Sequence, residues 1–96
     1  EVRAPLPTPR SGIAAGVVEE KVYVFGGEAP EGTFYENERY DPAMDTWQAM
    51  TLMPTARHGL GAASVGSRIY VLAGGTTPGG SESALNEVWV VVGGDP

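Results

Sequence analysis

Two arginines at equivalent positions are the side chains of this chain best suited to bind a ligand. Arg57 follows Arg10 by 47 residues, within two similar segments, PTPRSG and PTARHG. A guanidinium binds carboxylate or phosphate groups through two parallel hydrogen bonds. Ser11 and His58 directly follow the two arginines. We therefore take Arg10, Ser11, Arg57 and His58 as candidate ligand-binding residues, with an acidic peptide or a small anion as the ligand.

The same arginines have an alternative, structural interpretation. Arg10 would then pair with Glu38, and Arg57 with Glu87, in each case one strand away. A paired guanidinium holds strands together, whereas a free one binds an external anion. Both interpretations stay open at the level of sequence.

Catalysis and metal binding lack the residues that they need. The chain has no Cys and a single His, which removes thiolate nucleophiles, disulfides and zinc–thiolate sites. His58 alone cannot form a metal site within one chain. Ser11 has no base near it in the sequence, and no two carboxylates stand out as a general acid and base. We expect no catalytic residue, no metal and no cofactor.

The charge and the hydropathy pattern exclude two classes of partner. Twelve acidic and six basic residues give a net charge of -6, which argues against nucleic acid and anionic membranes. No apolar run approaches the roughly 18 residues of a transmembrane helix. We expect neither a nucleic-acid nor a membrane partner, and the absence of cysteine leaves the cellular compartment open.

The elements that position these residues are predicted to be short strands. Apolar runs are brief, rich in β-branched and aromatic residues, and bounded by Gly, Pro, Asn and Asp. Two-residue turns are expected at Glu19-Glu20 and Gly66-Ser67. Long loops are expected at 29–32 and 76–83. The predicted strands are Gly12–Val18, Lys21–Gly26, Thr33–Tyr40, Thr46–Met50, Gly59–Val65, Arg68–Ala73 and Leu85–Val92.

The 47-residue period divides these strands into a unit of four and a unit of three. The second unit stops at Gly93-Gly94-Asp95-Pro96 without a fourth strand. Counting back 47 residues from the last strand of the first unit reaches the N-terminus. We therefore expect residues 1–4 to complete a neighbouring unit, with the first unit at 8–50 and the second at 55–96.

The order of special residues resembles kelch repeats. In the first unit these are Gly26-Gly27, Tyr40 and Trp47; the second unit has Gly74-Gly75 and Trp89, with Ala73 as an extra residue. The segment from Met53 to Gly59 looks most like bacterial kelch domains.

This resemblance implies an all-β fold, a β-propeller segment of two four-stranded antiparallel blades. The second blade would be completed by the N-terminal strand of a neighbouring chain. Tyr40 and Trp47 would fill the wedge between blades, and small residues would line the innermost strands. In kelch proteins that bind acidic peptides, arginines at the matching position line the ligand pocket at the channel mouth.

Two blades cannot close a propeller, which has roughly four to eight. We expect cyclic self-association, with a homotrimer of six blades favoured over a tetramer of eight. The alternative is one segment of a longer propeller. The predicted function is a non-catalytic binding scaffold, and an enzyme of the sugar-mutarotase kind is the alternative. A natural or an engineered origin stays open.

Overall fold

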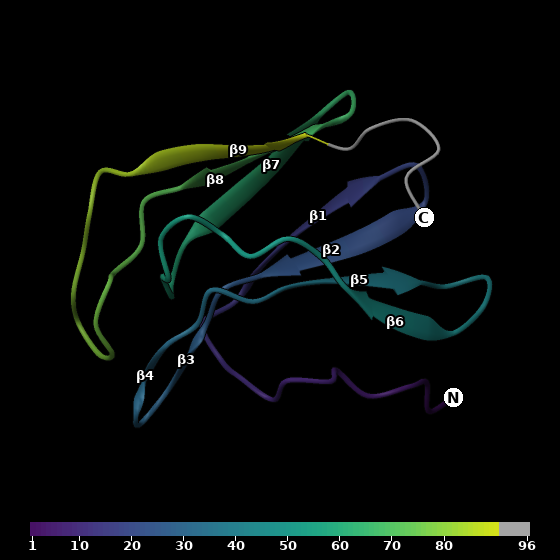
Figure 1. The fold of residues 1–96 in the computed structure, drawn as a ribbon, viewed down its shortest axis with the longest axis horizontal. Helices are drawn as coiled ribbons and strands as arrows, with labels where there is room; N and C mark the ends of the chain where they lie inside the picture. Colours follow the sequence, from purple (N-terminus) through teal and green to yellow (C-terminus); the bar gives the residue numbers. More distant parts are fainter. Residues whose placement is uncertain (91–96) are drawn as a thin grey trace.

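The computed structural model describes residues 1–90 as two antiparallel sheets and a short hairpin (Figure 1). No helix capable of spanning a bilayer occurs in these residues. The all-β antiparallel architecture expected from the sequence is confirmed. The strands are β1 (Ala14–Val18), β2 (Lys21–Phe25), β3 (Glu28–Ala29), β4 (Gly32–Thr33), β5 (Asn37–Asp41), β6 (Thr46–Ala49), β7 (Gly61–Val65), β8 (Arg68–Leu72) and β9 (Asn86–Val90).

The first sheet contains four strands in the order β1-β2-β5-β6. Its β1–β2 hairpin pairs Val18 with Lys21 across the predicted two-residue turn. Both turn residues, Glu19 and Glu20, have positive φ, at 53° and 65°. Two-residue hairpins favour such angles because their twist then matches that of the strands. Glutamate is an unusual choice there, and the turn forms because the flanking strands pair strongly.

The second sheet contains three strands in the order β7-β8-β9. Its first hairpin turns at Gly66, whose φ is +60°, as the sequence predicts. Strand β9 ends at Val90, so the last two residues of the predicted strand and the predicted turn at 93–96 lie outside the described residues. Within residues 1–90 nothing pairs with the outer edge of β9.

The loop expected at residues 29–32 is instead the tip of a third hairpin. Strands β3 and β4 pair Glu28 with Thr33 around a turn at Pro30-Glu31. The third long strand consequently begins at Asn37 rather than at Thr33. The intervening residues leave the ladder because Phe34 donates its backbone N–H to Gly27 instead.

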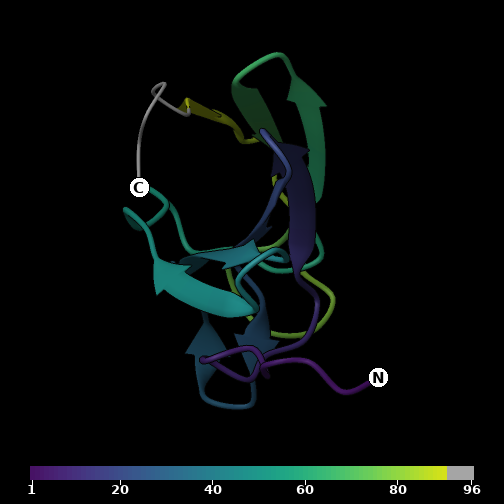
Figure 2. The same ribbon diagram turned by 90° about the vertical axis from the view of Figure 1, so that its right-hand side faces the viewer.

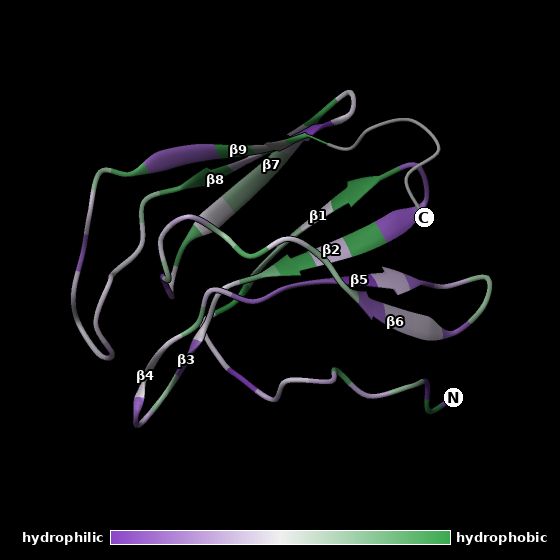
Figure 3. Cartoon of the chain, viewed as in Figure 1, coloured by the Kyte–Doolittle hydropathy of each residue, from purple (hydrophilic) through white to green (hydrophobic). Residues whose placement is uncertain are grey.

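The hydrophobic core lies between the two sheets. Strand β1 packs beside β7, as the two views show (Figures 1 and 2). Hydrophobic residues are concentrated on β1 and β2, whereas β5, β6 and the loops are mostly polar (Figure 3). The core therefore joins the sheets into one unit and holds the ends of their strands together. It consists of Ala14, Val18, Tyr23, Phe25, Met53, Leu60, Ile69 and Val71.

The glycine after β2 is required by both conformation and space. Gly26 has a φ of +67°, and a Cβ added there would lie 2.3 Å from the carbonyl oxygen of Arg57. A left-handed conformation without steric cost is available only to glycine. In the second sheet the extra residue Ala73 precedes the glycine pair and takes a φ of +59°. The backbone at Gly26 therefore leaves no room for a side chain.

The N-terminal segment runs past β5 and β6 without forming a strand in the single chain (Figure 1). Asp45 accepts the backbone N–H of Ala4 at 2.9 Å and the hydroxyl of Tyr40 at 2.7 Å. Trp47 donates its indole N–H to the carbonyl of Ala4 at 2.9 Å. The two aromatic rings are 5.0 Å apart between centroids. Pairing of residues 1–4 with a neighbouring chain stays a prediction.

Candidate functional site

Arg57 is the most completely buried of the candidate residues. Its side chain has no exposed surface, and one terminal nitrogen lies 2.8 Å from a carboxylate oxygen of Glu87 on β9. The guanidinium also donates to the backbone carbonyl of Ala73 at 2.8 Å and, at about 3.4 Å, to that of Val71. Thr55 donates its hydroxyl to the other oxygen of Glu87 at 2.9 Å. This cluster ties the segment before β7 to two strands of the second sheet.

The first sheet repeats the cluster at Arg10, with longer contacts. The Arg10 side chain is fully covered, and its terminal nitrogen lies 3.4 Å from Glu38 and 3.2 Å from the carbonyl of Val24. Thr8 donates to Glu38 at 2.6 Å. Burial lowers the pKa of the Arg10 guanidinium below its ordinary value, and the carboxylates of Glu38 and Glu36 oppose that shift. Two buried nitrogen atoms of Arg10, Nε and Nη1, have no hydrogen-bond partner, so this cluster is the weaker of the two.

These contacts confirm the structural pairing considered for the arginines. Arg10 pairs with Glu38, and Arg57 pairs with Glu87. Binding of an external anion by the same arginines stays a prediction. An external anion would have to displace the carboxylate of Glu38 or Glu87, or reach a guanidinium that neighbouring residues cover. Displacing the carboxylate would leave its buried charge without a partner.

Ser11 and His58 lie together at the ends of the two sheets. Ser11 forms an isolated bridge with Glu28, and His58 forms one with Gly75. His58 is buried; its Nδ1 lies 3.0 Å from a carboxylate oxygen of Glu28, and its Nε2 donates to the carbonyl of Thr77 at 2.8 Å. Both ring nitrogens face acceptors, so the imidazolium donates to both whereas a neutral ring satisfies one.

Glu28 is the site residue that sequence reasoning did not single out. Its second carboxylate oxygen accepts the backbone N–H of Gly79 at 2.9 Å. Glu28 therefore joins the end of the first sheet to two segments of the second. The available signal was its position directly after the glycine pair, but its partners, His58 and Gly79, follow from tertiary packing alone.

An open groove of about 270 Å³ lies beside these residues. It is lined by Ser11, Glu28, Ala29, Pro30 and Pro78. The described residues contain no group of three or more His, Asp or Glu side chains that could hold a metal ion. The groove offers one carboxylate, one hydroxyl and apolar surface, which suits contact with a partner rather than chemistry.

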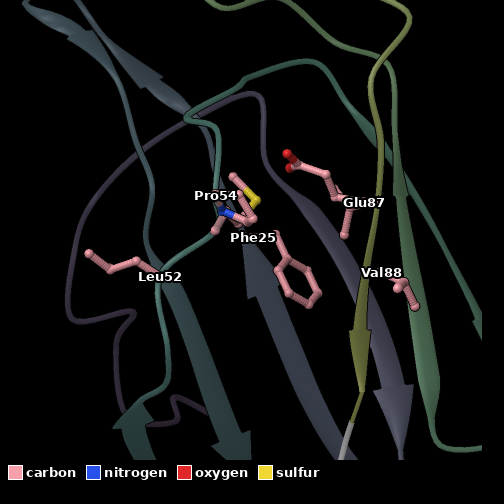
Figure 4. A pocket seen from close by; sticks show the side chains of 7 residues that line it. Phe25, Leu52, Pro54, Glu87 and Val88 are labelled. Atoms are coloured by element: carbon pink, nitrogen blue, oxygen red, sulfur yellow. The ribbon is translucent and has the colours of Figure 1, made fainter.

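A second, apolar pocket lies between the sheets and has a volume of about 30 Å³. Figure 4 shows Phe25 and Glu87 beside the pocket, with Leu52 and Pro54 on the connecting chain, whereas the side chain of Val88 points away from Phe25. Ligand pockets usually measure about 300–1,000 Å³. This pocket is therefore a gap in the packing, about the volume that one water molecule needs.

Comparison with known proteins identifies the repeat. Residues 9–54, which span the four strands of the first sheet, match the family model described as the Kelch motif. Residues 9–54 are a kelch repeat. The resemblance read from Gly26-Gly27, Tyr40 and Trp47 is confirmed.

The kelch relatives are much longer than this chain. Kelch-like protein 15 of chicken (Gallus gallus) is 42% identical over 45 residues, which cover 47% of this chain and 9% of that protein. The human protein of the same name is 40% identical over 45 residues, 8% of its length. Among solved structures, that of YjhT matches with a TM-score of 0.70 and 23% identity, over 78% of this chain and 24% of that one. At that identity the likeness concerns the kelch fold alone.

Proposed function

We propose that this kelch-repeat chain is a non-catalytic interaction scaffold whose sheets stack between copies into a closed ring. The kelch motif and the two stacked sheets support a propeller segment. In such a ring, the second sheet of one chain packs against the first sheet of the next chain. This head-to-tail arrangement closes when the rotations between successive chains add up to a full turn.

This proposal is carried by one observation: the exposed face of the second sheet is equivalent, in the repeat, to the buried face of the first sheet. The first sheet turns Val18, Tyr23 and Phe25 towards the second sheet, and each is at most 3% exposed. The equivalent residues of the second sheet lie on its opposite face, away from the first sheet, because side chains alternate along a strand. There Val65 is 62% exposed and Leu72 is 39% exposed.

The exposed face also includes two valines of the outer strand. Val88 and Val90 on β9 are 50% and 48% exposed. Burial of an apolar side chain of this size contributes about 1.5–3 kcal/mol when it is complete. A partner that covers this face would therefore recover roughly half of that for each exposed valine. The free edge of β9 beside it would accept a strand by β-augmentation, for which residues 1–4 of another copy are the predicted donor.

The stoichiometry follows from two sheets per chain. Identical chains form rings with an even number of sheets, so three copies give six and four copies give eight. We favour three copies. Seven sheets cannot form from identical chains.

The mass in solution tests the proposal. Light scattering or sedimentation at micromolar concentration should give three times the chain mass of 10.0 kDa. Val65→Glu should dissociate the assembly because it places a charge on the proposed contact face. Met44→Glu is the matched control, since Met44 is 69% exposed in the β5–β6 turn, outside both faces. A wild-type chain of 10.0 kDa at these concentrations would refute the ring.

A further inference from the structure

The contact between the two sheets depends on a glycine in the innermost strand. A Cβ added to Gly16 on β1 would lie 2.8 Å from Cγ2 of Ile69 and 3.0 Å from Oγ of Ser64. The same close approach lets Ser64 Oγ accept the backbone N–H of Val17 at 3.0 Å. Contacts of carbon atoms are favourable at about 3.5–4.0 Å. This junction therefore requires a residue without a side chain opposite an isoleucine.

The repeat places different residues at the equivalent positions on the outward faces. Ala63 on β7 corresponds to Gly16, since each pairs with the tyrosine of the next strand. Val22 on β2 corresponds to Ile69, since each lies one residue before that tyrosine. Ala63 thus has a methyl group that Gly16 lacks, and Val22 has one carbon fewer than Ile69. The changes have opposite sign, as expected if these two residues face each other.

Within one chain these two residues cannot meet. The neighbour of Ala63 in sequence, Ala62, packs against the core between the sheets, so Ala63 points away from the first sheet. Tyr23 points towards the second sheet and is 1% exposed, so Val22 points away from it. Ala63 and Val22 therefore lie on opposite outer faces of the two-sheet unit.

We propose that Val22 of a second copy packs against Ala63, in the place that Ile69 takes against Gly16. This inference rests on the proposed ring and adds the residues that set the register between copies. An isoleucine at position 22 would bring Cγ2 and Cδ1 within about 3.2 Å of the Ala63 methyl group, as the contacts at Gly16 show. Valine lacks Cδ1 and so removes the contact at 3.2 Å, whereas the contact of Cγ2 at 2.8 Å has to be relieved by a slightly wider spacing of the sheets.

A double-mutant cycle tests the contact. Sedimentation over a dilution series would compare the wild type with Val22→Ile, Ala63→Gly and the double variant. Val22→Ile should raise the dissociation constant about tenfold or more through overpacking. Adding Ala63→Gly should restore association to within about threefold of the wild type, because it reproduces the arrangement of Ile69 and Gly16. Ala63→Gly alone, which leaves a gap, is the matched control.

The outcomes separate the two proposals. A wild type that assembles, with additive effects of the two substitutions, would overturn this contact and leave the ring intact. A wild type that stays monomeric would overturn both, and would leave the next repeat of a longer chain as the partner of this face. Far-ultraviolet circular dichroism of each variant separates a lost contact from a lost fold.

Discussion

Replacing Arg57 tests whether the arginines serve the fold or an external ligand. In Arg57→Ala the carboxylate of Glu87 loses its charged partner at 2.8 Å, and the carbonyl of Ala73 loses a hydrogen bond of the same length. The Arg57 side chain is fully buried and that of Glu87 is 22% exposed, so water can replace the guanidinium only in part. We expect the substitution to destabilise the folded chain.

The expected loss is about 3–5 kcal/mol, the cost of removing one partner of a buried ion pair. Arg10→Ala should cost less, about 1–3 kcal/mol. Its contact with Glu38 is longer, at 3.4 Å, and two of its buried nitrogen atoms have no partner to lose. The two clusters thus provide an internal comparison in which the same substitution has different consequences.

Urea unfolding followed by tryptophan fluorescence measures these differences, with all variants at one protein concentration because association also adds to stability. Arg57→Met combined with Glu87→Leu is the control. It removes both charges and should recover most of the loss. If Arg57→Ala unfolds within about 1 kcal/mol of the wild type, the structural role is refuted, and anion binding becomes the better explanation for the repeated arginines.

Two further predictions concern the sheet junction and the N-terminal segment. Gly16→Ala should lower the thermal unfolding midpoint because the added methyl group clashes with Ile69, at a cost of about 1–3 kcal/mol. Adding Ile69→Val should recover part of that loss. Equal midpoints for the single and the double variant would contradict this. The backbone N–H of Ala4 and then the hydroxyl of Tyr40 hold the pKa of the Asp45 carboxyl below its ordinary value. A carboxyl whose pKa is lower in the folded state adds stability above its unfolded value and loses that contribution as the pH falls through the folded value. Acid unfolding below about pH 4 should therefore begin at higher pH in Asp45→Asn, and carbon-13 NMR titration of that carboxyl should show an unshifted pKa if the contacts do not form.

Much of the fold follows from short-range signals. The two-residue turns, the glycine pairs and most of the strands are local features, and the structure places them near where the sequence predicts, except for the hairpin at 28–33 and the later start of β5. The pairing of Arg10 with Glu38 and of Arg57 with Glu87 is one of two interpretations that the sequence leaves open, and both pairs form in the structure. A pattern that appears twice is easier to interpret than one that appears once.

The missed features depend on contacts between the repeats. Glu28 falls between the predicted strand Lys21–Gly26 and the predicted loop at 29–32, yet it lies in a hairpin and pairs with His58 in the other unit. The second repeat has Gly75 at the equivalent bridge position, so the period gave no hint of a carboxylate there. The proposed packing of Val22 against Ala63 likewise rests on the contact of Gly16 with Ile69, which lies between the repeats.

The connection between the sheets has a consequence for how the chain folds and unfolds. The backbone of Met53 and of Arg57 donates to residues of the first sheet's loop, Tyr35 and Phe34, while the Arg57 side chain holds the second sheet. The segment from Met53 to Arg57 is thus hydrogen-bonded to both units at the same time. Repeat proteins can melt one unit at a time when the coupling between neighbours is weak. Here neither sheet can open without releasing that segment, so hydrogen exchange in β2 and β8 should proceed through a single shared opening rather than two independent ones.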